Sequence, residues 1–132
     1  IRENLMLITT PISLGEILDK ISILVIKEKN ISDPNKQKHI KKELLSLYET
    51  LDKYISRDKV REHIDSLIAI NAKLWKIEDD IRDCERKNIF DQKFIDLARS
   101  VYFTNDKRSQ LKLEINNKFG SELVEIKSYE KY

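Results

Sequence analysis

Residues 12–30 decide the fold, and they read ISLGEILDKISILVIKEKN. Ser13 followed three positions later by Glu16 is a capping box, in which each side chain satisfies a free backbone N–H at a helix start. The apolar residues Ile12 and Ile17 flank this start and are spaced as a hydrophobic staple. We therefore predict a helix that begins after Ser13 and extends through this stretch.

Apolar periodicity continues along the same stretch. The apolar side chains recur at helical spacing and form one stripe: Leu14, Ile17, Leu18, Ile21, Leu24 and Val25. Ile23 and Ile26 widen this stripe, so we expect other elements to cover the helix on more than one side. A buried β-strand over residues 21–26 is the competing interpretation, because a short apolar run fits either structure.

Three more helices are expected downstream. Asp33 and Pro34 are the residue types preferred at the N-cap and first position of a second helix. A long third helix is expected over about residues 58–88. A fourth is expected to begin after the N-cap Asp91 and to end at Gly120, which follows its last turn. The second helix carries apolar residues in the 4-3-4-3 spacing of a coiled-coil seam: Ile40, Leu44, Leu47, Leu51 and Tyr54.

These elements predict an all-α protein, either an antiparallel helical bundle or an extended helical hairpin, of about four helices with coiled-coil-like packing. The 132 residues suit a single domain, and two Gly and two Pro leave few turns for a β fold. We expect residues 1–10 to be flexible or not native, with Met6 as the candidate start. Residues 121–132 are expected to pack on the bundle or on a partner.

Composition narrows the classes of function. The net charge of +2, from 25 basic and 23 acidic residues, gives no electrostatic argument for a nucleic-acid or membrane binder. The apolar run over residues 21–26 is too short to span a bilayer, so we expect no membrane insertion. The single cysteine, Cys84, cannot form an internal disulfide, which favours the cytoplasm. No phosphate loop, nucleophile elbow or zinc motif is present, and we expect no cofactor and no metal.

The densest polar segment is the first candidate site. Residues 78–86 read EDDIRDCER, and Glu78, Asp79 and Asp83 are its candidate acidic groups. The pattern Asp80-x-x-Asp83 resembles half of the paired carboxylates that all-helical nucleotide pyrophosphohydrolases place on facing helices, but we find no second pair. The alternative is a solvated helix face with ion pairs between successive turns.

The second candidate site interrupts the fourth helix with polar residues where apolar ones are expected. In one interpretation the interruption is structural, because buried polar groups must be paired. Arg108 would then pair with Asp79 or Asp83 across antiparallel third and fourth helices, and Asn71 and Asn105 would set helix alignment. In the other interpretation the side chains form a pocket for a phosphate or carboxylate. Its candidate anion-binding residues are Arg99, Tyr102, Asn105, Arg108 and Lys112.

Five segments carry a family resemblance: residues 11–21 (PISLGEILDKI), 74–82 (LWKIEDDIR), 94–102 (FIDLARSVY), 104–108 (TNDKR) and 120–129 (GSELVEIKSY). Together they resemble an uncharacterised family of short helical bacterial and phage proteins, over nearly the whole chain. Members of that family are often encoded near glycosyltransferase and cell-surface polysaccharide genes. The family has no assigned activity, so the resemblance implies only a link to sugar or nucleotide-sugar metabolism.

A second resemblance concerns the first helix alone. Residues 17–21 (ILDKI) are similar to the opening helix of all-helical chorismate mutases, which bind a dicarboxylate with Arg, Lys and Asn from several helices. The first helix here has no arginine and offers only Lys20, Lys27 and Lys29. This similarity is an analogy of fold, and fold does not imply function.

The leading functional hypothesis is a non-enzymatic interaction or accessory protein linked to cell-surface polysaccharide biosynthesis. The alternative is a binder of a phosphate, nucleotide sugar or dicarboxylate, or an enzyme acting on one, through the polar stripe of the third and fourth helices. A third hypothesis is an adaptor that captures another protein's helix. A homodimer is expected, because the long seams exceed what one chain can cover.

Overall fold

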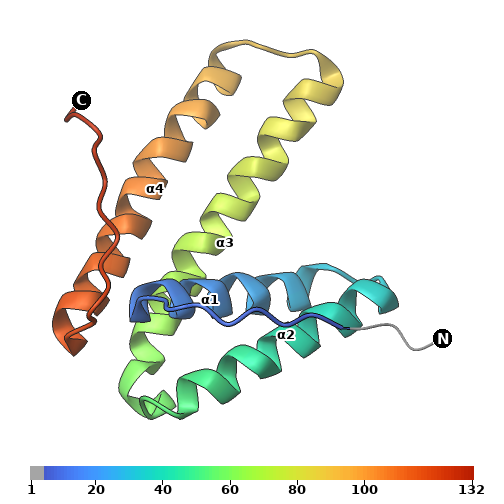
Figure 1. Cartoon of the computed structure of the whole chain (residues 1–132). Helices are drawn as coiled ribbons and strands as arrows, with labels where there is room; N and C mark the ends of the chain where they lie inside the picture. Colours follow the sequence, from blue (N-terminus) through green and yellow to red (C-terminus); the bar gives the residue numbers. More distant parts are fainter. Residues whose placement is uncertain (1–4) are drawn as a thin grey trace.

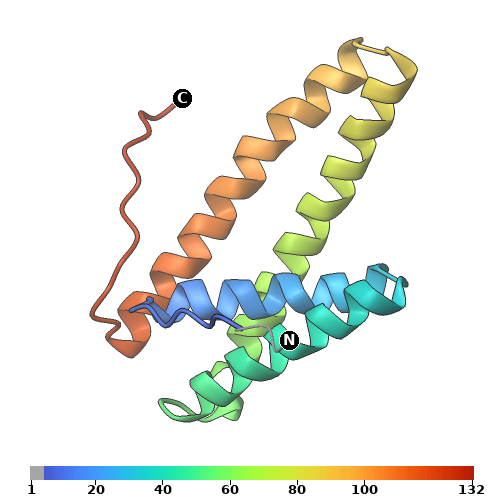
Figure 2. The same cartoon turned by 45° about the vertical axis from the view of Figure 1, so that its right-hand side comes forward.

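The computed structural model describes residues 5–132, and this part of the chain contains four helices. They are α1 (Leu14–Asn30), α2 (Pro34–Asp52), α3 (Arg57–Lys87) and α4 (Gln92–Phe119). Two antiparallel hairpins result, and the α1–α2 hairpin crosses the base of the longer α3–α4 hairpin (Figures 1 and 2). The predicted all-α fold is confirmed, and the strand interpretation of residues 21–26 is wrong. Among residues 5–132, no helix combines the length and apolar character needed to cross a bilayer.

The helices begin and end where local sequence signals predict. Ser13 and Asp33 each accept a hydrogen bond from the backbone N–H three residues later, at 3.1 and 3.0 Å. Asn88 and Gly120 follow the last turns of α3 and α4 in the left-handed conformation, with φ of 54° and 67°. These caps pair backbone groups that a helix leaves free at its ends.

The first helix is the centre of the molecule. It contacts all three other helices, whereas α2 packs mainly against α1. The core gathers where the two hairpins cross, and its buried members are Ile17, Leu18, Ile21, Leu51, Val60, Ile64, Leu67 and Ile115. Burial of each such side chain stabilises the fold by about 1.5–3 kcal/mol. The broad apolar stripe of α1 is therefore explained by neighbours on several sides.

The start of α1 lies directly against the end of α4. The Gly15 N–H donates to Asn116 Oδ1 at 2.7 Å. A Cβ atom on Gly15 would lie 2.7 Å from the Lys112 carbonyl oxygen, so glycine permits this close approach. Asn116 Nδ2 is buried and has no hydrogen-bond partner among residues 5–132.

The α3–α4 hairpin extends well beyond α1 and α2 (Figure 1). Within residues 77–101, which form its distal half, only Ile77 and Cys84 are buried. At the tip, Ile89, Phe90 and Ile95 are 42%, 53% and 46% exposed. Two helices that pack only on each other cannot cover all of their apolar side chains.

The segments outside the helices differ in their contacts. Of the predicted N-terminal extension, residues 1–4 lie outside the described part of the chain, and residues 5–10 form neither helix nor strand. Residues 121–132 run back along α4 (Figures 1 and 2). Near the end of this tail, the Tyr132 ring packs against Tyr102 and Phe103.

Candidate functional site

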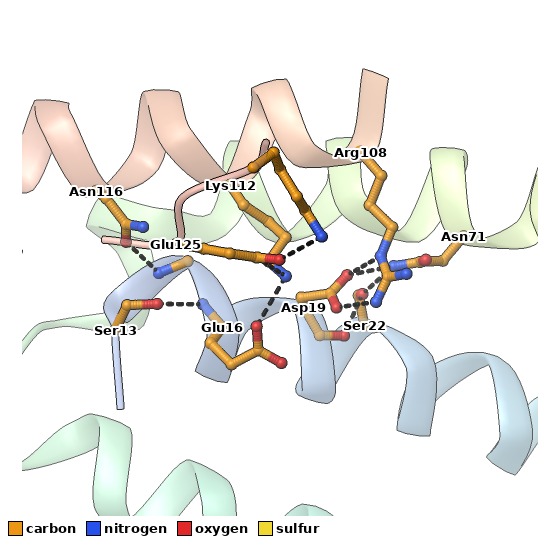
Figure 3. Close-up of polar contacts among 11 residues, drawn as sticks. Ser13, Glu16, Asp19, Ser22, Asn71, Arg108, Lys112, Asn116 and Glu125 are labelled. Atoms are coloured by element: carbon orange, nitrogen blue, oxygen red, sulfur yellow. Dashed lines mark hydrogen bonds and ion pairs between the residues drawn. The ribbon is translucent and has the colours of Figure 1, made fainter. Parts of the chain in front are cut away.

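A buried carboxylate lies where α1, α3 and α4 meet. Asp19 of α1 is 1% exposed, and its Oδ1 accepts hydrogen bonds from Arg108 Nε at 2.9 Å and Asn71 Nδ2 at 2.8 Å. Arg108 Nη2 donates to the other carboxylate oxygen, which makes the pair bidentate. Asn71 also donates to Ser22 Oγ at 2.8 Å (Figure 3). Because three helices contribute, this network holds them in one register.

The partner of Arg108 is therefore Asp19, and the predicted pairing with Asp79 or Asp83 is wrong. The helix α1 lies against α3 and α4 and brings a carboxylate into a buried position, where charges are screened less than on an exposed face. The hydrogen bond to Asp19 raises the pKa of Arg108, although burial opposes the charge. Asp19 and Ser22 are polar residues within the apolar stripe of α1, a signal that the sequence analysis did not use.

A second set of ion pairs surrounds Lys112, one turn further along α4. Its Nζ lies 2.7 Å from Glu16 Oε2 and 2.6 Å from Glu125 Oε2 (Figure 3). Burial lowers the pKa of Lys112, but hydrogen bonds to Glu125 and Glu16 leave it raised overall. Hydrogen bonds from Lys112 and then Lys127 lower the pKa of Glu125 to about 2. Lys112 thus joins α1, α4 and the tail.

A pocket of about 430 Å³ lies beside the Asp19 network, between α1, α3 and α4. Four apolar and six polar side chains line it: Ile23, Ile26, Leu74 and Trp75, with Asn71, Glu78, Asp79, Arg82, Asn105 and Arg108. Its volume falls within the range of about 300–1,000 Å³ that is typical of small-molecule sites. The Arg108 side chain is 27% exposed and uses Nε and Nη2 for Asp19, which leaves Nη1 for a ligand.

The pocket unites residues from both candidate sites of the sequence. Asn105 and Arg108 of α4 face the same space as Glu78 and Asp79 of α3, because antiparallel helices place these segments side by side. Sequence reasoning did not include Trp75, Arg82 and Asn71 in a pocket. Trp75 and Arg82 lie three and four residues from Glu78 and Asn71 lies seven residues from it, so their helical spacing on one face of α3 was the available signal.

The remaining candidate anion-binding residues, Arg99, Tyr102 and Lys112, do not line this pocket, so the structure does not gather all five in it. The Arg99 guanidinium lies 5.9 Å from the centre of the Phe103 ring. Tyr102 packs on Phe103 and Tyr132. The ammonium of Lys112 is occupied by Glu16 and Glu125, as described above.

The rest of the acidic segment of α3 forms ion pairs on the helix surface. Asp80 lies 2.9 Å from Lys76 Nζ, and Asp83 lies 2.9 Å from Lys87 Nζ. The hydrogen bond from Lys87 lowers the pKa of Asp83. Within residues 5–132, no three His, Cys, Asp or Glu side chains lie close enough together to hold a metal ion.

The polar residues of the pocket supply both donors and acceptors. The guanidinium of Arg82 can present paired donors to a phosphate or carboxylate, and that of Arg108, whose Nε and Nη2 donate to Asp19, can add Nη1. The carboxylates of Glu78 and Asp79 accept hydrogen bonds, as ligand hydroxyl groups require. Trp75 adds a flat apolar surface next to these groups.

Comparisons with known proteins found no relative of this chain. No family model matches the chain, and no significant match was found among curated proteins or solved structures. The functional argument therefore depends on the geometry of the pocket and its surroundings.

Proposed function

We propose that this protein binds a small, anionic, hydroxyl-bearing molecule, such as a sugar phosphate or nucleotide sugar, in the pocket between α1, α3 and α4. One observation carries the proposal: Arg82 and Arg108 converge with Glu78 and Asp79 around Trp75 in a single concave site. If these side chains only formed a solvated helix face, there would be no reason for residues of two helices to surround one pocket. A concave wall that combines apolar surface with a few polar groups is typical of ligand sites.

Arg108 is the central anion-binding residue in this proposal. Asp19 holds its guanidinium plane in one orientation, so little side-chain freedom is lost when a ligand binds to Nη1. Arg82 provides a second guanidinium from the adjacent helix. Glu78 and Asp79 would accept hydrogen bonds from sugar hydroxyls, and Trp75 would cover the apolar face of a sugar ring.

The family resemblance supports the same pocket. Residues 74–82 and 104–108, two of the segments that carry it, supply most of the lining residues. We therefore propose an accessory role in cell-surface polysaccharide biosynthesis. The single cysteine, Cys84, is buried and unpaired, which supports the cytoplasm as the site of action. We also propose that the protein works as a homodimer.

A thermal-shift titration tests the binding proposal. The probes are sugar phosphates, nucleotide sugars, dicarboxylates and Mg²⁺. A ligand at 100 times its Kd stabilises the native state by about 2.7 kcal/mol, so a sugar phosphate or nucleotide sugar should raise Tm with dose.

Matched variants locate any ligand that is found. Arg82→Ala should abolish the response, because it removes an anion donor without touching the Asp19 network. Lys76→Ala removes a positive charge of α3 outside the pocket and should keep the response. A chain that no probe stabilises, or an unchanged response in Arg82→Ala, would contradict the proposal.

A second candidate function is a non-enzymatic interaction protein, or an adaptor for a partner's helix. The observation that favours it is the apolar tip of the α3–α4 hairpin, where Ile89, Phe90 and Ile95 are exposed. Contiguous exposed apolar surface is typical of interaction sites.

A further inference from the structure

We infer that two copies of this chain associate through one face of the α3–α4 hairpin, in antiparallel orientation, so that the tip of each covers the open side of the other's pocket. The closure of the pocket by the second copy rests on the proposed function. The association gives the geometry of the homodimer proposed above and is argued from the hairpin alone, without the ligand.

The face that lines the pocket continues along the hairpin toward its tip. On α4, Ile95 and Tyr102 lie two turns apart on one side of the helix, and Tyr102 precedes the pocket residue Asn105 by about one turn while its ring also packs on Tyr132 of the tail. The side chains of Ile95 and Tyr102 are 46% and 42% exposed. On α3, the line through Trp75 and Arg82 runs in the same direction. One amphipathic face therefore extends from the pocket to the exposed tip.

The distal hairpin lacks a third helix to cover this face. Phe94, Leu97 and Val101 are only half-buried there, and Ile89 and Phe90 are exposed. Two hairpins packed face to face would form a four-helix arrangement that covers these side chains on both copies. A second copy meets this requirement without any other protein.

The charges on this face of one copy are complementary to those on the same face of a second copy in antiparallel orientation. Glu78 and Arg82 are both exposed and lie one turn apart on the pocket face of α3. A two-fold axis between them would place each Glu78 opposite the Arg82 of the other copy, twice per dimer. At 1.5 Å per residue, Lys87 at the end of α3 lies about 10 Å from this axis on one side and Asn71 about 13 Å on the other. The tip of one copy therefore reaches the Asn71 end of the other's pocket.

The apolar tip of one copy would meet apolar side chains of the other copy's pocket. Ile23 and Ile26 of α1 line the pocket with apolar surface and follow Ser22, which accepts a hydrogen bond from Asn71. The exposed Phe90 would pack against this apolar surface and exclude water from the adjacent polar groups. The pocket is open on one side, whereas ligand sites usually enclose about 70–90% of their ligand. The second copy would supply this missing wall.

Charge reversal with mixing tests the association. The wild-type chain should have the mass of a dimer by light scattering after size exclusion. Glu78→Arg and Arg82→Glu each put like charges opposite one another, and each variant alone should be monomeric. An equimolar mixture should recover the dimer, because the new arginine of one chain meets the new glutamate of the other. A monomeric wild type, or a mixture that stays monomeric, would overturn the inference.

A tip variant tests whether the second copy closes the pocket. Phe90→Asp should be monomeric and lose most of its ligand-induced Tm shift. The control Leu45→Asp, at a side chain of α2 that is 61% exposed, should remain dimeric and keep the full Tm shift. A monomeric Phe90→Asp with a full Tm shift would overturn closure. A dimeric wild type that no probe stabilises would instead contradict the proposed function. If Phe90→Asp does not fold, as judged by circular dichroism, the mixing experiment decides the association.

Discussion

At the scale of single residues, the pairing of Asp19 with Arg108 determines how α1, α3 and α4 meet. The carboxylate is almost completely buried, and besides Arg108 it has one side-chain donor, Asn71. An unpaired charge in that position would be costly, because the protein around it is a poorer solvent for ions than water. Arg108 therefore has a structural role even if its free Nη1 also binds a ligand.

Replacing Arg108 tests its structural role. Arg108→Ala should lower the free energy of unfolding by about 3 kcal/mol, because it leaves Asp19 buried without its cation. The control Lys76→Ala, exposed on α3 outside the pocket, should change it by about 0.5 kcal/mol or less. Urea unfolding measures both values. Similar small losses in the two variants would show that the Asp19 pair does not hold the helices together.

At the scale of elements, charge fastens the C-terminal tail to α1 and α4 through Glu125 and Lys112. The pKa of Glu125 is about 2, below its ordinary 4.5, so the contact stabilises the fold above about pH 4.5 and is lost as pH falls toward 2. The pKa of Lys112 is raised above its ordinary 10.5, so its contribution is complete below that pH and is lost at higher pH. Between these limits the attachment should not depend on pH.

A pH series with Glu125→Gln tests this attachment. The variant should be less stable than the wild type by at most about 1 kcal/mol, because the ion pair is partly exposed. The difference should stay constant from about pH 5 to 9 and shrink as pH falls from 4.5 toward 2. Urea unfolding at each pH gives the difference. Glu122→Gln, exposed in the same tail, is the control and should match the wild type throughout.

At the scale of the whole molecule, stability is concentrated where the two hairpins cross. The core residues lie in α1, at the end of α2, in the first half of α3 and near the end of α4. The distal half of the α3–α4 hairpin, residues 77–101, contributes only Ile77 and Cys84 to the buried set. Regions with few buried apolar contacts open more readily than the core.

Native-state hydrogen exchange tests this distribution. In Glu78→Arg, which the proposed interface predicts to be monomeric, amides of residues 77–101 should exchange at least tenfold faster than those near Leu18 and Leu67, because the distal hairpin has less buried surface. In the proposed wild-type dimer, the second copy should slow exchange of the distal amides. Uniform protection along α3 in the monomeric variant would contradict the unequal distribution of stability.

Local sequence signals are enough to predict the four helices and their ends. The caps at Ser13, Asp33 and Gly120 act through hydrogen bonds and backbone preferences within a few residues, so they can be recognised without the fold. The apolar stripe of α1 also predicted cover on several sides. Because α3 and α4 are antiparallel, Asn105 lies near Glu78 in the fold, although in the sequence their segments are two separate candidate sites.

Which charges pair, and where a pocket forms, depend on how distant segments pack in the folded chain. Arg108 and Asp19 are 89 residues apart, and although Asp19 interrupts an apolar stripe, the local sequence does not show that it meets Arg108 in place of Asp79 or Asp83. The choice depends on the position of α1 against α3 and α4, because burial makes one pairing much stronger than the exposed alternatives. The pocket likewise needs Ile23 and Ile26 of α1 beside the polar residues of α3 and α4. Local interactions define helices, whereas packing between distant segments defines the site.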